Sequence, residues 1–141
     1  DTGNEGLNAA LIKAVQECRE KGIRFRYVVM GRPDRIDSMD MGTLLYNLLS
    51  NGIEACMAVE TERELELVVR EEDGTTEIFM ENTISGSVLK NNPNLESRKQ
   101  DKRYHGFGME SIRGIIGKYQ GHYSYREESG RFIQEIDLRD G

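Results

Sequence analysis

The 141-residue sequence contains no tryptophan, two prolines and two cysteines, and no apolar run approaches the roughly 20 residues of a membrane-spanning helix. It also lacks the pattern of a secretory signal peptide. Cys18 and Cys56 both lie within helical patterns, and we interpret them as reduced core residues. These absences together favour a cytosolic domain.

A concentrated basic surface is missing as well. The formal net charge is −6, and basic residues are adjacent in the sequence only at 98–99 and 102–103. Nucleic-acid binding is therefore disfavoured, because phosphate contacts along a duplex require a concentrated positive face. A chain of this length can bury a core, and no linker or repeat divides it. We expect residues 1–141 to form one domain.

Hydrophobic periodicity predicts both helices and strands. We expect helices over 5–21, over 41–59 with Asp40 as N-cap, and from Met109 to a cap at Gly121. We expect a strand over 23–30. Two hairpins should follow the turn residues, pairing 64–70 with 75–80 around Asp73-Gly74 and 123–126 with 132–138 around Ser129-Gly130. This arrangement predicts an α+β fold, a two-layer sandwich with helices on one face of a mixed, mostly antiparallel sheet.

A glycine motif precedes the third predicted helix, in the segment His105-Gly-Phe-Gly-Met-Glu-Ser-Ile112. Gly106 and Gly108 allow backbone N–H groups at the start of a helix to approach an anion closely, and the helix dipole favours negative charge there. Such a motif is suited to a phosphate chain. Taken alone, it is equally consistent with a turn before a surface helix.

A polar ridge lies beside the apolar stripe of the second predicted helix. Asn47 and Asn51 are one turn apart, and Glu54 follows three residues after Asn51. Asparagine is a poor helix former, so two of them beside a buried face point to a shared ligand. Amide oxygens suit Mg²⁺, which takes few protein ligands. The alternative is a solvated ridge, or hydrogen bonds to another element.

Together these two segments resemble a known family. The helix Leu45-Tyr-Asn-Leu-Leu-Ser-Asn-Gly-Ile-Glu-Ala-Cys56 resembles the N box of the GHKL (Bergerat-fold) ATP-binding superfamily, and residues 105–112 resemble its second glycine box. The order and separation of the two motifs are specific, although either motif alone is not. The sequence is most similar to sensor histidine kinases that detect secreted quorum-sensing peptides, and the resemblance covers nearly the whole chain.

The resemblance implies an ATP site with Mg²⁺. It implies that Asn51 is the metal ligand, that Asn47 and Glu54 are catalytic positions, and that Asn47 and Asn51 also bind nucleotide. The glycine box would contribute His105, Gly106, Phe107, Gly108 and Met109 to the nucleotide site. The polar segment 86–104 would be a lid in which Lys99 or Lys102 contacts the phosphates. A merely solvated loop is the alternative, and we expect disorder without nucleotide.

One departure from the family concerns adenine. Most members carry an Asp-x-Gly-x-Gly box whose aspartate binds the adenine amino group, whereas this chain reads Glu81-Asn-Thr-Ile-Ser-Gly86. An asparagine oxygen can accept the same hydrogen bond without a charge, so Asn82 is our first candidate for the adenine contact and Glu81 the second. The alternative is that Asn82 is an ordinary turn residue at a strand end. We expect micromolar or weaker nucleotide affinity.

The implied reaction is phosphoryl transfer. Asn47 stands where the hydrolysing branches of the superfamily carry a glutamate that activates water, and an amide lacks that basicity. Neither His105 nor His122 lies in a long helix, as a phosphoacceptor histidine would. We therefore expect the phosphoacceptor histidine in a dimerisation domain N-terminal to Asp1. The sequence begins at Asp1 without a methionine, which is the pattern of an excised domain. This chain would then be a monomeric fragment of a membrane-anchored homodimeric kinase that signals to a response regulator.

Two other interpretations remain open. A serine kinase of the anti-sigma-factor kind shares the fold but needs no histidine-bearing domain. A degenerate nucleotide-binding or interaction module is suggested by the missing Asp-x-Gly-x-Gly box. A MutL-like or gyrase-like ATPase is the least favoured, because Asn47 replaces the catalytic glutamate.

Overall fold

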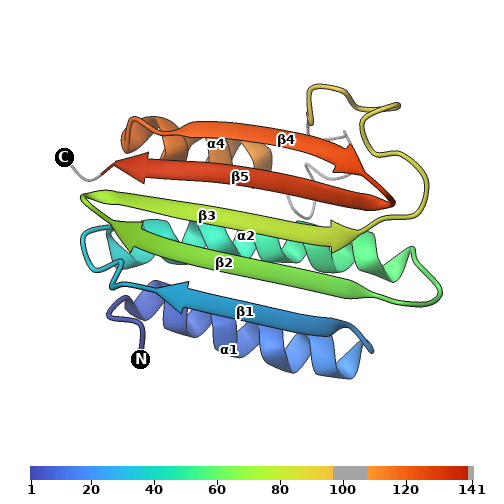
Figure 1. Ribbon diagram of the computed structural model, residues 1–141, viewed down its shortest axis with the longest axis horizontal. Helices are drawn as coiled ribbons and strands as arrows, with labels where there is room; N and C mark the ends of the chain where they lie inside the picture. Colours follow the sequence, from blue (N-terminus) through green and yellow to red (C-terminus); the bar gives the residue numbers. More distant parts are fainter. Residues whose placement is uncertain (97–107, 140–141) are drawn as a thin grey trace.

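The computed structural model describes residues 1–96 and 108–139, in which three helices cover one face of a five-stranded sheet (Figure 1). The elements are α1 (Glu5–Glu20), β1 (Arg24–Met30), α2 (Ser38–Met57), β2 (Glu64–Glu72), β3 (Thr75–Thr83), α4 (Gly108–Lys118), β4 (His122–Glu128) and β5 (Arg131–Arg139). The strand order is β1-β2-β3-β5-β4. Only β1 and β2 pair in parallel, and every other pair is antiparallel. The predicted α+β two-layer sandwich is confirmed.

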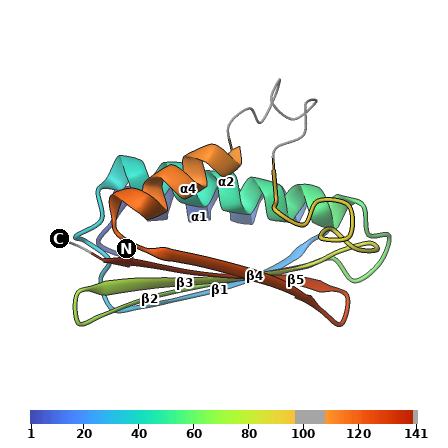
Figure 2. The same ribbon diagram turned by 90° about the horizontal axis from the view of Figure 1, so that it is seen from above.

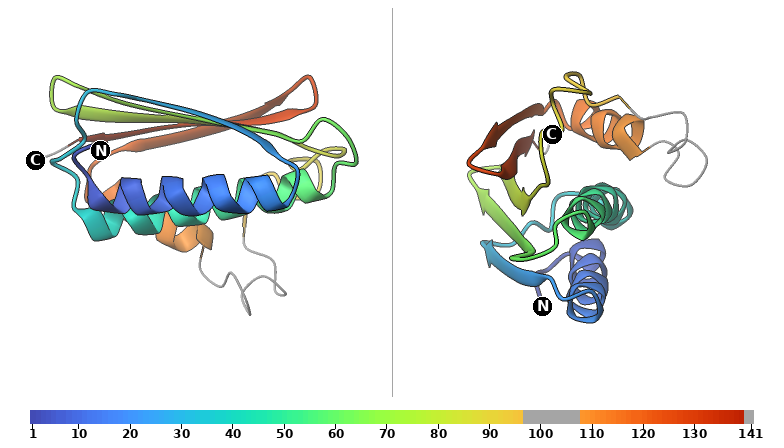
Figure 3. Two further views of the ribbon diagram at one scale, coloured as in Figure 1. Left: turned by 90° about the horizontal axis from the view of Figure 1, so that it is seen from below. Right: turned by 90° about the vertical axis from the view of Figure 1, so that its right-hand side faces the viewer.

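The helices lie together on one side of the sheet, and none of the described helices lies on the opposite side, which we call the open face (Figures 2 and 3). Alternation along the strands explains this arrangement, because successive side chains point to opposite faces. Leu65, Leu67 and Val69 of β2 are buried against the helices, as are Ile78 and Met80 of β3. No helix within the described residues is long and apolar enough to cross a bilayer.

Glycine allows α1 and α2 to pack closely. A Cβ built on Gly6 would lie 1.9 Å from the carbonyl oxygen of Ser38 and 2.7 Å from the backbone nitrogen of Gly42. Both neighbours are backbone atoms, which cannot move aside independently. The crossing of the two helices therefore requires a residue without a side chain at position 6.

The start of α2 differs from the prediction. Asp37, not Asp40, is the N-cap, and its Oδ2 accepts a hydrogen bond from the backbone N–H of Asp40 at 3.0 Å. The Asp40 carboxylate instead accepts hydrogen bonds from Lys118 Nζ and the Tyr119 hydroxyl, both at 2.7 Å. These contacts, Lys118 first, lower the pKa of Asp40. They fasten the start of α2 to the end of α4.

The predicted turns at Asp73-Gly74 and Ser129-Gly130 are confirmed, with positive φ at both residues of each pair. The end of α4 is different from the predicted glycine cap. Gln120 adopts the left-handed conformation at φ 52°, and the N–H of Gly121 donates to Ile116 O at 2.8 Å. A Cβ on Gly121 would lie 1.9 Å from Asp137 O. This glycine is thus required because the chain passes close to β5.

Candidate functional site

A pocket of about 400 Å³ opens on the helix-covered side of the sheet, between α2, the start of α4 and the inner faces of β3 and β5. Much of its wall is apolar, formed by Ala55, Ile84, Val88, Leu95, Met109 and Phe132. Polar groups enter it from Asn51, Glu54, Asn82 and Gln134. A mainly apolar cavity with a few directed polar groups is typical of a site for a flat organic ligand.

The polar ridge predicted on α2 borders this pocket. Asn51 and Glu54 line it, and the Asn51 side chain makes no hydrogen bond to another described residue. Asn47 lies one turn earlier, where its Nδ2 donates to Thr43 O at 2.9 Å. A Cβ built on Gly108 would lie 3.5 Å from Asn47 Oδ1, so this oxygen faces the start of α4. The ridge therefore presents amide oxygens toward both the pocket and the glycine box.

Asn82 lies within β3, because the strand continues to Thr83 beyond the predicted end at Met80. The alternative that Asn82 is a turn residue is therefore wrong. Its side chain is buried at 1% exposure, and its Nδ2 donates to Thr83 O at 3.1 Å. No described residue donates to its Oδ1, although buried acceptors are almost always satisfied. This oxygen, in the wall of the pocket, is available to a donor on a ligand.

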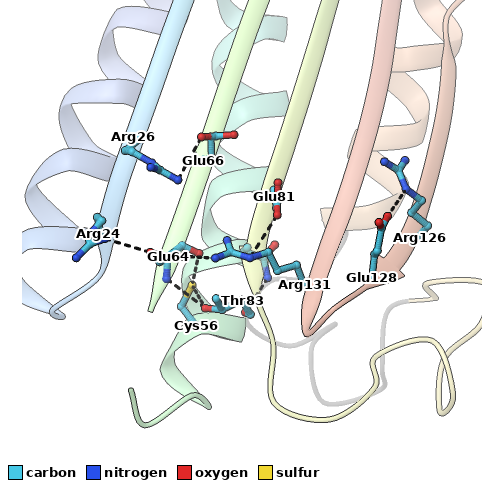
Figure 4. Close-up of polar contacts among 11 residues, drawn as sticks. Arg24, Arg26, Cys56, Glu64, Glu66, Glu81, Thr83, Arg126, Glu128 and Arg131 are labelled. Carbon is cyan, nitrogen blue, oxygen red and sulfur yellow. Dashed lines mark hydrogen bonds and ion pairs between the residues drawn. The ribbon is translucent and has the colours of Figure 1, made fainter. Parts of the chain in front are cut away.

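Glu81, the second candidate for adenine, points the other way. Figure 4 shows it on the open face with Arg131, whose Nε lies 3.4 Å from Glu81 Oε1. Arg131 also pairs with Glu64 at the start of β2, and this contact lowers the pKa of Glu64. The structure thus brings Asn82 to the pocket and places Glu81 in an ion-pair cluster across the sheet from it.

Gln134 of β5 is a pocket residue that the sequence analysis did not identify. It is 5% exposed and lies on the strand face that carries Phe132, Ile136 and Leu138. The sequence of β5 could have identified it, because Gln134 is the one polar residue among the apolar residues on that face of the strand. The same signal marks Asn82, which follows Thr76, Ile78 and Met80 on the inner face of β3.

Residues 86–96 differ from the disordered loop that we expected. The Glu127 carboxylate of β4 accepts hydrogen bonds from Ser87 Oγ at 2.7 Å, from the N–H of Leu89 at 3.0 Å, and from the N–H of Val88. The Tyr125 hydroxyl donates to Pro93 O at 2.9 Å. These contacts hold the segment against β4, where it forms part of the pocket wall.

The glycine box lies partly within the described chain. Gly108 and Met109 begin α4 and line the pocket, and their contact with nucleotide stays a prediction. The predictions for Lys99, Lys102, His105, Gly106 and Phe107 lie outside the described residues and stay predictions. His122 lies on β4 beside Asp137, with His122 Nδ1 and Asp137 Oδ1 3.1 Å apart, and it does not line the pocket.

A family model describing the GHKL domain matches residues 36–139, which include both motifs and the whole pocket wall. The chain belongs to the GHKL family. The fold and the position of the pocket beside the N-box helix agree with this assignment. None of the curated proteins matches the chain.

Solved histidine kinase domains share the fold of this GHKL chain. The nucleotide-free catalytic domain of the histidine kinase ThkA superposes with a TM-score of 0.74 at 15% identity, covering 99% of this chain and 93% of that one. The mycobacterial sensor histidine kinase MprB gives 0.68 at 15% identity, with 96% and 93% covered. The histidine kinase domain of the blue-light-activated EL346 protein of Erythrobacter litoralis gives 0.69 at 15% identity, with 90% and 57% covered.

Proposed function

We propose that this GHKL domain is the ATP-binding catalytic domain of a two-component sensor histidine kinase, and that it transfers the γ-phosphate of ATP to a histidine of a separate dimerisation domain. The observation that carries the proposal is the buried Asn82 Oδ1, an acceptor with no partner among the described residues, in a largely apolar pocket beside the N-box helix. The GHKL assignment and the shared fold of the kinase domains support it.

Adenine fits the pocket by its chemistry. Its 6-amino group would donate to Asn82 Oδ1, and its ring would pack on apolar side chains such as Ile84, Met109 and Phe132. A neutral amide replaces the family's aspartate, so this hydrogen bond is not charge-assisted. We therefore expect ATP to bind with micromolar or weaker affinity.

The phosphates would leave the pocket toward the start of α4. Backbone N–H groups at Gly108 and Met109 would bind them there, where the helix dipole also favours an anion. Bound Mg²⁺ would neutralise phosphate charge during transfer. Asn51 would be its protein ligand, because the amide has no other described partner and lies on the same wall as Glu54. Glu54 would orient a water of the metal shell.

Asn47 favours transfer to a protein acceptor over hydrolysis. Its Nδ2 is engaged by Thr43 O, and its remaining oxygen is an amide oxygen, which does not remove a proton from water at neutral pH. Phosphoryl transfer needs mainly positioning and charge neutralisation, which the pocket and the N-box ridge would supply. A histidine nitrogen presented by another domain would be the nucleophile.

We further propose the setting in which this transfer takes place. The acceptor histidine would lie in a dimerisation domain N-terminal to residue 1, and the phosphoryl group would pass on to a response regulator. The complete kinase would be a homodimer anchored in the membrane, with this domain in the cytoplasm. The resemblance of both boxes to the peptide-sensing group supports a quorum-sensing peptide as its signal.

Phosphate transfer in the longer protein tests the proposal. The protein is incubated with Mg²⁺ and ATP labelled in the γ-phosphate, beside an Asn51→Ala variant. We expect label on a histidine, which is stable to base and lost in acid, and little label in the variant. Label that survives acid but not base would indicate the anti-sigma-type serine kinase instead. No label, together with no ATP binding, would indicate a degenerate module.

A further inference from the structure

Gln134 places a second buried hydrogen-bonding group in the pocket, and its orientation is fixed. The Tyr123 hydroxyl donates to Gln134 Oε1 at 2.5 Å. Burial raises the pKa of Tyr123, so the phenol stays protonated and remains a donor. Because Tyr123 binds Oε1, the Nε2 amide group of Gln134 points away from Tyr123.

No acceptor for Gln134 Nε2 exists among the described residues. The side chain is nevertheless 95% buried, being 5% exposed, and it lines the same pocket as Asn82. Leaving a buried donor without an acceptor is unfavourable, and native proteins rarely do so. The inner face of the sheet therefore presents to the pocket an acceptor without a described partner, Asn82 Oδ1, and a donor without one, Gln134 Nε2.

The register of the sheet places these two groups side by side. Asn82 pairs with Phe132, and Met80 pairs with Gln134, so Asn82 and Gln134 are diagonal neighbours on one face of an antiparallel pair. Diagonal neighbours have Cβ atoms about 7–8 Å apart or somewhat less, which lets long side chains reach a common ligand. The two groups therefore present an acceptor beside a donor to whatever enters the pocket.

We infer that Gln134 is a specificity-determining residue that reads the base together with Asn82, an inference that rests on the proposed ATP function. Adenine presents a donor, its 6-amino group, next to an acceptor, N1, which complements Asn82 Oδ1 and Gln134 Nε2. Guanine presents the reverse, an acceptor at O6 and a donor at N1. Tyr123 is a positioning residue, because it keeps the donor of Gln134 toward the base.

Nucleotide analogues test the inference on the unaltered chain. Calorimetric titration in Mg²⁺ compares ATP with 1-deaza-ATP, in which C–H replaces N1, and with purine riboside triphosphate, which lacks the 6-amino group. We expect each analogue to bind about threefold to tenfold more weakly than ATP, the effect of one net hydrogen bond. Equal affinities for ATP and 1-deaza-ATP would overturn the role of Gln134 and leave the proposed function standing. No binding of any nucleotide would overturn both.

Variants then assign each contact. Gln134→Met should bind ATP about threefold to tenfold more weakly, lose discrimination against 1-deaza-ATP, and keep discrimination against the purine riboside analogue. Tyr123→Phe should reduce the preference for ATP over GTP, because the Gln134 amide can then turn. Gln16→Met, an exposed change on α1, should alter nothing. A Gln134→Met protein that still distinguishes 1-deaza-ATP would contradict the inference, and the analogue series decides if the variant does not fold.

Discussion

Gly52 of α2 lies directly against Asn82 of β3, such that a Cβ built on the glycine would be 3.6 Å from Asn82 Oδ1. The N-box helix thus packs closely against the sheet beside the buried acceptor of the pocket. A side chain at position 52 would also meet Leu65 Cδ1 at 2.9 Å and Met80 Cε at 3.2 Å. These are ends of flexible side chains, which can move aside.

This relationship predicts that Gly52→Ala affects binding more than stability. The better helix propensity of alanine, worth about 1 kcal/mol, roughly offsets the crowding of Leu65 and Met80. The free energy of unfolding should change by less than about 1 kcal/mol. ATP affinity should fall, because Gly52 lines the pocket and the methyl group would fill space beside Asn82 Oδ1. Urea unfolding and calorimetry measure the two quantities. Gly42→Ala, in the same helix but away from the pocket, should leave ATP affinity unchanged.

Gly6→Ala should destabilise the fold strongly. Its Cβ would overlap the carbonyl oxygen of Ser38, so α1 and α2 would have to separate, at a cost of at least about 2 kcal/mol. The control is Gly114→Ala in α4, where a Cβ meets nothing within 4 Å and should stabilise by up to about 1 kcal/mol. Urea unfolding measures both. Equal stability of the two variants would show that the α1–α2 crossing tolerates a side chain.

Asp40→Asn should lower stability more at neutral pH than in acid. Lys118 and Tyr119 lower the pKa of Asp40, so its stabilising contribution is present above the unfolded pKa of about 3.9 and is lost as pH falls through the folded pKa. The contribution should be about 1 kcal/mol or less, because Lys118 is largely exposed. Urea unfolding of both proteins at about pH 7 and about pH 3 tests this. A difference that does not become smaller at the lower pH would contradict the assignment.

Glu127→Ala should loosen residues 86–96 without unfolding the domain. The carboxylate binds the N–H groups of Val88 and Leu89, and charge-assisted hydrogen bonds of this kind contribute about 1.5–3 kcal/mol. Amide exchange at both positions should accelerate, and ATP affinity should fall because Val88 lines the pocket. Glu128→Ala, whose carboxylate pairs with Arg126 on the open face (Figure 4), should change neither quantity.

The sequence predicts local features of this domain well. Alternation and helical spacing identify the strands and helices, and the turns at 73–74 and 129–130 follow from their residue types. The two family motifs also predict that Asn51, Gly108 and Met109 meet in one site, which they do. These predictions succeed because each depends on neighbouring residues or on a motif with a defined spacing.

Contacts between distant elements were not predictable in the same way. Asp40 was expected to cap its own helix, but its partners Lys118 and Tyr119 lie 78 and 79 residues away. Gln134 joins Asn82 only through the pairing of β3 with β5. Residues 86–96 read as an irregular polar segment, and the side chain that fixes them, Glu127, lies on a later strand. In each case the partner is set by the packing of elements that lie far apart in the sequence.

The most direct test of the account is calorimetric titration of the domain with Mg²⁺ and a non-hydrolysable ATP analogue, for the unaltered chain, Asn82→Ala and Asn91→Ala. Asn82 is buried in the pocket wall, whereas Asn91 is exposed and outside it. We predict saturable binding that is retained in Asn91→Ala and weakened about tenfold or more in Asn82→Ala. Undiminished binding by Asn82→Ala, or no binding by the unaltered chain at millimolar nucleotide, would contradict the account.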